Sequence, residues 1–171
     1  LDSSPDKQYY AIGFKNNDGG YVLRSSLTKK CTSSAMTTLS PEGVITNQVS
    51  GSKVLVFEGF MDFLSWLSNV QQDTPEYDCC ILNSVSNIDK ALPWITAHNN
   101  IAAFMDNDEA GRKTLQKIIE NVPDDAGKVC VYDMAKLYED YNDLNEKLSD
   151  ELSSKDEHSS INTHNHGDNT I

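Results

Sequence analysis

Short apolar runs alternate with amphipathic segments along residues 53–152, and this alternation predicts strands that are each followed by a helix. An unbroken apolar strand is covered on both of its faces, which is typical of a parallel sheet with helices on either side. The predicted strands are 53–57, 79–82, 101–105 and 128–133, and the predicted helices are 60–70, 86–98, 109–122 and 141–152.

Apolar positions within the predicted helices mark the faces that we expect to be buried. In the second helix, Pro93 is expected to kink or split the helical pattern, because proline removes a backbone donor. The residues expected to face the core are Phe60, Phe63, Leu64, Leu67 and Val70 in the first helix and Leu115, Ile118 and Ile119 in the third.

The rest of the chain has a different texture. Residues 8–27 hold two apolar runs around "NNDGG", which predicts a hairpin because Asn, Asp and Gly supply the turn. Residues 28–52 are rich in Ser, Thr and Gly, and we expect irregular structure that ends in a short strand near Val44 and Ile45. The last residues have almost no apolar content, which predicts disorder.

The predicted fold class is therefore α/β, with a central, mostly parallel sheet of about four strands and helices on both faces. A small β-rich segment precedes it. We expect three parts: an N-terminal segment with a β-hairpin at 1–52, the α/β domain at 53–152 and a disordered tail at 153–171.

Composition points to a cytoplasmic protein without a membrane partner. No apolar run approaches the roughly 20 residues needed to cross a bilayer, and the N-terminus lacks the pattern of a secretory signal. The four cysteines show no metal-binding spacing, so we expect reduced thiols. The chain does not begin with Met, which is consistent with a fragment of a longer protein.

The net charge of −12 is unevenly distributed. Residues 1–52 hold 5 basic and 4 acidic residues, whereas residues 53–152 hold 8 basic and 19 acidic ones. A domain with this balance will not hold a nucleic-acid strand by a basic surface alone. Bound divalent cations or another domain would have to help.

Acidic residues follow three of the predicted strands: Glu58 after the first, Asp106 and Asp108 after the third, and Asp133 at the end of the fourth. Ligands of such sheets bind beyond the carboxyl ends of the strands. Because residues i and i+2 of an extended segment point the same way, we expect Asp106 and Asp108 to face one crevice with Glu58. Converging carboxylates repel one another unless a cation neutralises them, and hard oxygen ligands suit Mg²⁺ or Mn²⁺.

Structural roles compete with this interpretation. Asp108 would serve well as a helix N-cap, and Asp133 could simply begin a loop. Gly59 would let the chain turn sharply into its helix. Gly111 lies in the first turn of a helix, where close approach of another group would explain a glycine. Two units occur together in one predicted sheet: a strand, Glu-Gly and a helix, and then a strand, Asp-x-Asp and a helix. This combination favours a metal-binding site over separate structural roles.

This combination resembles the Toprim domain, the catalytic fold of bacterial DNA primases, of type IA and type II topoisomerases and of several nucleases. "VFEGFMDFLS" resembles the EGxxD element of primases, "MDNDEAGRKT" resembles their DxDxAGR element, and "YNDLNE" resembles a later acidic element. The likeness covers about residues 53–150. Upstream, "YAIGFKNNDGGYVLRS" resembles the segment that precedes Toprim in primase-like proteins, some of them carried on bacterial mobile elements.

The resemblance implies a role for each matching residue. Glu58, Asp106 and Asp108 would be the catalytic acids, and with Asp143 they would hold Mg²⁺ or Mn²⁺. The residues implied in substrate or nucleotide binding are Gly59, Asp62, Gly111 and Arg112.

The sequence departs from the family pattern in several places. Asn142 replaces a family Lys that faces phosphate, and Asn145 stands where replicative primases often carry another acid. Arg112 could equally be a surface residue paired with Glu109 or Asp108. No zinc-ribbon Cys/His set is present, so a zinc-binding module or a helicase is expected as a separate partner.

Three functions fit the resemblance. The leading hypothesis is a primase-like nucleotidyltransferase that uses a single-stranded DNA template and nucleoside triphosphates. The second is a Toprim nuclease, which would use the same acids to cut a phosphodiester with water. The third is a degenerate Toprim used for binding or assembly. A topoisomerase fits less well, because the chain has no room for the DNA-binding domain that carries its tyrosine nucleophile.

Overall fold

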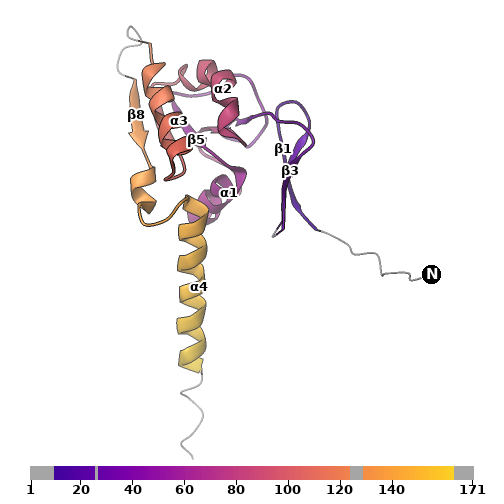
Figure 1. The fold of residues 1–171 in the computed structure, drawn as a ribbon, viewed down its shortest axis with the longest axis vertical. Coiled ribbons are helices and arrows are strands. Elements are labelled where there is room, and N and C mark those ends of the chain that lie inside the picture. Colours follow the sequence, from indigo (N-terminus) through magenta and orange to yellow (C-terminus); the bar gives the residue numbers. More distant parts are fainter. Residues whose placement is uncertain (1–9, 26, 124–128, 164–171) are drawn as a thin grey trace, which may run out of the picture.

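The computed structural model describes residues 10–25, 27–123 and 129–163, with side chains up to residue 155. A small antiparallel sheet and a larger mixed sheet flanked by helices make up the fold (Figure 1). The strands are β1 (Ile12–Lys15), β2 (Tyr21–Arg24), β3 (Lys29–Cys31), β4 (Thr37–Leu39), β5 (Lys53–Phe57), β6 (Asp78–Ile81), β7 (Asn100–Phe104) and β8 (Cys130–Asp133). The helices are α1 (Phe60–Asn69), α2 (Ile88–Ile95), α3 (Glu109–Glu120) and α4 (Leu144–Thr163), with short 3₁₀ turns η1 (Val85–Asn87) and η2 (Ala135–Tyr138).

The larger sheet has the strand order β4-β6-β5-β7-β8, in which β5, β6, β7 and β8 are parallel. This arrangement confirms the predicted α/β fold class. The two central strands, β5 and β7, pair in register from Lys53 opposite Asn100 to Phe57 opposite Phe104. Their carboxyl ends therefore open side by side at one edge of the sheet.

The structure differs from the prediction at one edge, where β4 adds a fifth strand antiparallel to β6. We expected irregular structure for residues 28–52, which contain both β3 and β4. Ile45 makes an isolated bridge to Leu39 and does not belong to a longer strand. Thr37 and Thr38 are fully buried, so polar β-branched residues form this strand where an apolar pattern would have been easier to detect.

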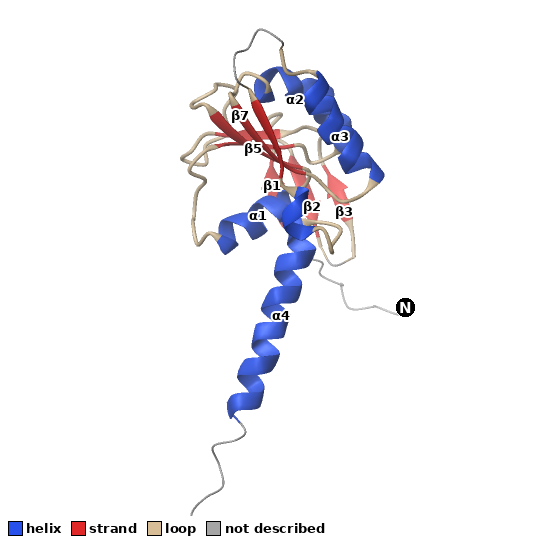
Figure 2. Ribbon diagram, turned by 90° about the vertical axis from the view of Figure 1, so that its left-hand side faces the viewer, coloured by secondary structure: helices blue, strands red, loops and turns tan. Residues whose placement is uncertain are grey.

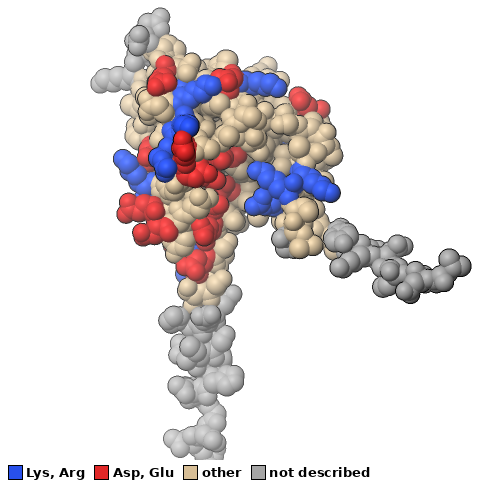
Figure 3. Space-filling view, in the orientation of Figure 1, with Lys and Arg blue, Asp and Glu red and all other residues tan. Residues whose placement is uncertain are grey.

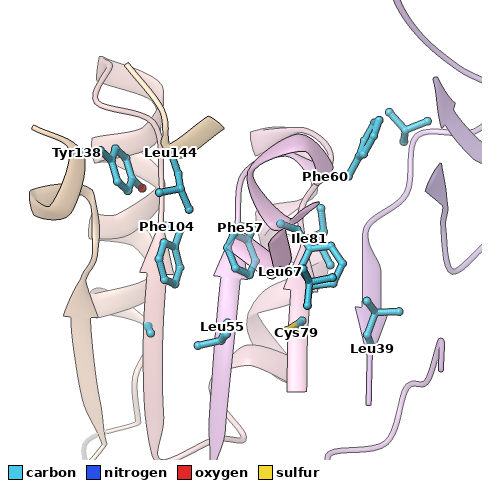
Figure 4. Close-up of a cluster of buried hydrophobic side chains, with 13 residues drawn as sticks. Leu39, Leu55, Phe57, Phe60, Leu67, Cys79, Ile81, Phe104, Tyr138 and Leu144 are labelled. Atoms are coloured by element: carbon cyan, nitrogen blue, oxygen red, sulfur yellow. The ribbon is translucent and has the colours of Figure 1, made fainter. Parts of the chain in front are cut away.

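Alternate residues of the strands supply two hydrophobic cores, one on each face of the larger sheet. Leu55 and Phe57 pack with the core that includes α1, η2 and the start of α4, whereas Val54 and Val56 pack with α2 and α3. In the first core the rings of Phe57 and Phe104 stack with their centroids 4.7 Å apart (Figure 4). Helices thus cover both faces, as predicted (Figure 2).

Two residues that we expected in the core are substantially exposed: Val70 at 38% and Ile119 at 47%. α1 ends at Asn69, so Val70 lies beyond its buried face. On α3, Ile118 is fully buried and takes the position against the sheet, which turns the adjacent Ile119 outward because successive helical residues point about 100° apart. Pro93 lies inside α2, which ends at Ile95.

The small sheet packs against the larger unit near the start of α1. Phe14 of β1 stacks on Phe60 with ring centroids 5.2 Å apart. The backbone carbonyl of Lys15 accepts a hydrogen bond from Thr37 Oγ1 at 2.9 Å. The predicted hairpin is present as β1 and β2, and Gly19 adopts the positive φ of 78° that its turn requires. These contacts fix where β2 and β3 lie relative to the sheet edge.

α4 runs away from the body of the protein (Figures 1 and 2) and continues to Thr163. Residues 153–163 are therefore helical, which corrects the prediction of disorder from residue 153; residues 164–171 lie outside the described part. A helix anchored at its start by buried Leu144 can propagate through a polar sequence. Among the residues described, no helix is both long and apolar enough to cross a membrane.

The position of α4 predicts unequal effects for two leucines on one helix. Leu144 is 8% exposed and Leu152 is 61% exposed. Leu144→Ala should lower the free energy of unfolding by about 2–5 kcal/mol because it leaves a cavity in the core. Leu152→Ala is the matched control and should change it by less than about 0.5 kcal/mol. Urea unfolding measures both, and equal losses would contradict this packing.

Candidate active site

The carboxyl ends of β5 and β7 border a hollow of about 110 Å³ that is lined by charged side chains. Glu58 directly follows β5, and Asp106 comes two residues after β7. The backbone N–H of Asp106 donates to Glu58 Oε2 at 3.2 Å, which holds the two segments together. The charged residues that line the hollow are Arg24, Lys29, Glu58, Asp62, Asp106 and Asp143.

Two of these acids come from the starts of helices. Asp62 lies in the first turn of α1, is 7% exposed, and accepts the N–H of Asn145 at 3.1 Å. Asp143 immediately precedes α4, and its Oδ1 accepts the N–H of Glu146 at 2.7 Å, as an N-cap residue does. The structure therefore brings four of the predicted site acids together from three distant parts of the sequence.

Asp108 has a different environment from the one expected. It is exposed, and its Oδ1 accepts the N–H of Gly111 at 2.7 Å, so it caps α3. It is not among the described residues that line the hollow. Its charge still reaches the site, because it raises the pKa of both Glu58 and Asp106. This hydrogen bond holds one carboxylate oxygen of Asp108 toward α3, and the role of Asp108 as a metal ligand stays a prediction.

Burial and mutual repulsion make the carboxylates harder to ionise. Burial is the largest cause in each case, and repulsion from neighbouring acids adds to it. Burial and then Glu58 raise the pKa of Asp106 to about 7. Burial and then Asp143 raise the pKa of Asp62 to about 6. Burial also raises the pKa of Glu58, although the N–H of Asp106 and the charge of Lys29 act in the opposite direction.

Two basic residues face these acids from the small N-terminal sheet. Arg24 ends β2 and Lys29 begins β3, where they are paired strand residues, and both are exposed. Figure 3 shows Lys and Arg gathered over the small sheet and Asp and Glu gathered over the neighbouring surface. Lys29 also lines an adjoining hollow of about 220 Å³ that contains Lys30. The sequence offered a signal, the basic excess of residues 1–52, but it could not place these side chains.

The two glycines predicted in the site act through the space that they leave. A Cβ on Gly111 would lie 2.1 Å from the backbone oxygen of Asp106, so α3 packs directly on the chain that carries this acid. This is the close approach that the sequence suggested. Gly59 has an extended backbone, with φ −124° and ψ 157°, that any residue can adopt. A Cβ there would lie 3.1 Å from Asp62 Oδ2, so its small size leaves room for this carboxylate.

Arg112 and Asp133 make local contacts with the backbone. Arg112 is exposed, and its Nη1 donates to the carbonyl of Asn107 at 2.9 Å. The predicted pairing of Glu109 occurs instead with Lys113, at 2.6 Å. Asp133 Oδ1 accepts the N–H of Ala135 at 3.1 Å, so this residue begins the turn after β8.

The acids suit a hard divalent cation by their chemistry. Among the described residues, no group of three or more His, Cys, Asp or Glu side chains is arranged to hold a metal ion. The hollow nevertheless offers carboxylate oxygens as donors, and burial followed by repulsion from neighbouring acids raises the pKa of Asp62 and of Asp106. Such a donor set fits Mg²⁺ or Mn²⁺ better than softer metals.

Comparisons with known proteins give two family matches. A family model described as Toprim-like matches residues 55–148, and a domain of unknown function matches residues 3–33. No curated protein matches the chain.

Two solved structures have a similar fold. The primase fragment of the bacteriophage T7 primase-helicase protein is 20% identical with a TM-score of 0.52, and the match covers 80% of this chain and 56% of that one. A bacteriophage T7 complex of a lagging-strand DNA polymerase with primase domains, bound to an RNA/DNA hybrid and dTTP, is 22% identical with a TM-score of 0.49, covering 86% and 72%. The chain thus spans little more than half of the primase fragment.

The raised pKa values predict that stability falls as pH rises. Asp106 and Asp62 bind protons more tightly in the folded chain than in the unfolded one, so the folded state is progressively disfavoured between about pH 4 and pH 7. Asp106→Asn should have a higher Tm than the wild type at pH 8. The difference in Tm between the two proteins should be smaller at pH 4, where Asp106 of the wild type is protonated. A change of about 1 kcal/mol would shift the Tm by roughly 2–4 °C in a chain of this size.

Thermal unfolding in metal-free buffer at several pH values measures this effect. Asp73→Asn is the matched control, because Asp73 is exposed and does not line the charged hollow. A Tm of Asp106→Asn that never exceeds the wild-type value above pH 7 would contradict the prediction that ionisation of Asp106 disfavours the folded state.

Proposed function

The chain belongs to the Toprim-like family, as its motifs predicted, and we propose that it is a primase-like nucleotidyltransferase domain. The observation that carries this proposal is the clustering of Glu58, Asp62, Asp106 and Asp143 at the carboxyl ends of β5 and β7, with Arg24 and Lys29 opposite. Acids that bind divalent cations beside cations that bind phosphate form a site for a nucleoside triphosphate.

Toprim domains generally bind divalent metals, and the donor set described above fits Mg²⁺ or Mn²⁺. Glu58, Asp106 and Asp143 would hold the ions, with Asp62 and Asp108 adding negative charge nearby. When bound, such ions neutralise the charge that develops on phosphate during phosphoryl transfer. Residues of the chain orient the acids: the Asp106 N–H fixes the Glu58 carboxylate, Gly59 leaves room for Asp62, and Gly111 lets α3 lie close to Asp106.

Arg24 and Lys29 would bind the phosphates of the incoming nucleotide or of the template. Their guanidinium and ammonium groups are exposed and border the hollow, so a phosphate placed there would contact cations on one side and metal-bearing acids on the other. On this reading the 53–152 part supplies the acids and the 1–52 part supplies the basic residues. Arg112 contributes indirectly, since its contact is with the backbone of Asn107.

This function requires a single-stranded DNA template and nucleoside triphosphates. We propose that the protein acts in the cytoplasm. The chain carries a large negative net charge, so binding of a template would gain from a further module, such as a zinc-binding module or a helicase. The name of the T7 primase-helicase protein supports the second of these.

Loss of a central acid should abolish synthesis. We expect Glu58→Gln and Asp106→Asn each to reduce the rate of oligonucleotide synthesis on a single-stranded template by at least about 100-fold, because each removes a charge that holds a metal ion. Asp73→Asn should have no effect. The measurement uses labelled nucleotides with Mg²⁺ or Mn²⁺, in the chain and in any longer natural protein that contains it.

The same assay separates synthesis from cleavage. Labelled DNA is incubated with and without nucleotides. If the DNA is shortened without added nucleotides, and this shortening is lost in Asp106→Asn, the protein is a nuclease and the proposal is wrong. If the assay yields neither new oligonucleotides nor cleaved DNA, and calorimetry finds no Mn²⁺ binding that depends on Asp106, the chain is a degenerate binding module.

The basic residues should affect nucleotide or template binding more than turnover. We expect Arg24→Gln and Lys29→Gln each to raise KM by about tenfold, because each removes one charge-assisted contact to phosphate, with a much smaller change in kcat. Lys90→Gln, at an exposed position on α2, is the matched control. Steady-state kinetics at two salt concentrations measures both constants. Unchanged KM values in both variants would show that the small sheet does not take part in binding the substrate.

A further inference from the structure

The chain between β8 and α4 carries Asp143 into the acidic hollow, and Asn107 is bonded to this chain at three points. The backbone N–H of Asn107 donates to the carbonyl of Asn142 at 2.7 Å. Its side-chain Nδ2 donates to the carbonyl of Tyr138 at 2.8 Å and to that of Tyr141 at 2.9 Å. We refer to residues 138–143 as the docked segment.

The chemistry of these contacts suits an asparagine. The side-chain amide has two N–H groups, and each has a carbonyl partner in the docked segment. An aspartate has the same shape but, when ionised, it donates nothing and would repel the two carbonyl oxygens. An alanine would leave both carbonyls without this partner. Asn107, the residue between the two acids of the Asp-x-Asp pattern, therefore makes its side-chain contacts with a distant part of the sequence.

Asn107 is itself held from a third element. Arg112 of α3 donates from Nη1 to the Asn107 carbonyl at 2.9 Å. The residue consequently connects the end of β7, the first turns of α3 and the docked segment. Asp106, its neighbour in the chain, and Asp143, at the end of the docked segment, both line the hollow.

We propose that Asn107 is a positioning residue that sets the place of Asp143 relative to Asp106. Through it, the carboxylate that precedes α4 is brought to the two carboxylates at the ends of the central strands. The role of Asp143 as a metal ligand rests on the proposed function, whereas the attachment of the docked segment does not.

Other contacts should preserve the fold when the amide is removed. Tyr138 is buried, and its hydroxyl donates to the carbonyl of Met105 at 3.0 Å. The N–H of Met134 donates to the carbonyl of Ala103 at 2.9 Å, and Leu144 is in the core. These contacts hold both ends of the docked segment, so loss of the amide loosens the segment without detaching it.

The first experiment measures hydrogen exchange in metal-free protein. Asn107→Ala should increase the exchange rate of amides in residues 138–143 by at least tenfold and leave the amides of β5 and β6 unchanged. Asn121→Ala is the matched control, because it removes one amide-to-carbonyl bond, to Lys117, at the other end of α3. Unchanged exchange in the docked segment would overturn the proposal whether or not the protein binds metal.

The second experiment measures Mn²⁺ binding by calorimetry in a double-mutant cycle. Asn107→Ala should weaken binding about tenfold in the wild-type background and leave it unchanged in the Asp143→Asn background, because the amide acts through that carboxylate. An equal loss in both backgrounds would show a general structural effect and overturn the proposal. If the wild type binds no Mn²⁺, the metal part of the proposed function fails, and the exchange experiment alone decides the role of Asn107.

Discussion

Parallel pairing of β5 with β7 is the constraint on which the site depends. The register that sets Phe57 opposite Phe104 also sets Glu58 beside the chain that leads to Asp106. Two hydrophobic cores, one on each face of the sheet, hold this register. Burial therefore stabilises an arrangement that the carboxylates alone would oppose, since like charges at close range repel.

The hydrophobic cores stabilise the fold, whereas repulsion among the carboxylates destabilises it, and this contrast is relevant to function. Groups whose ionisation is disfavoured in the folded state are typical of active sites, because a ligand of opposite charge recovers the stability that the empty site loses. Arg24 and Lys29 supply part of that opposite charge from a separate sheet. This sheet overlaps a segment that matches a domain of unknown function, and its position beside the acids gives that segment a candidate role in binding phosphate.

The sequence was most informative where chemistry follows local pattern. Apolar runs predicted the four parallel strands, and Glu58 and Asp106 could be placed because they come within two residues of the ends of β5 and β7. β4 was missed because two of its three buried residues are threonines, whose hydroxyls find partners in the folded protein. α4 was predicted too short, since composition does not show that a polar helix is anchored at its start.

Tertiary placement explains the remaining differences. Asp108 was predicted either as a metal ligand or as an N-cap. The hydrogen bond that it accepts from the Gly111 N–H shows the N-cap, and the ligand role stays a prediction. The contacts of Asn107 and the approach of Lys29 to the acids join residues far apart in the sequence. No periodicity or spacing within a single segment encodes such contacts, so they required the three-dimensional structure.

Gly111 offers a way to recognise this crevice in other chains. Exchanging Glu58 or Asp106 for its amide changes the charge of the crevice but hardly changes the volume of the side chain. A side chain at position 111 would collide with the backbone of Asp106, and the first turn of α3 would have to move away from the sheet. A related sequence that keeps its acids but carries a larger residue at this position should therefore have a displaced helix and a differently shaped crevice.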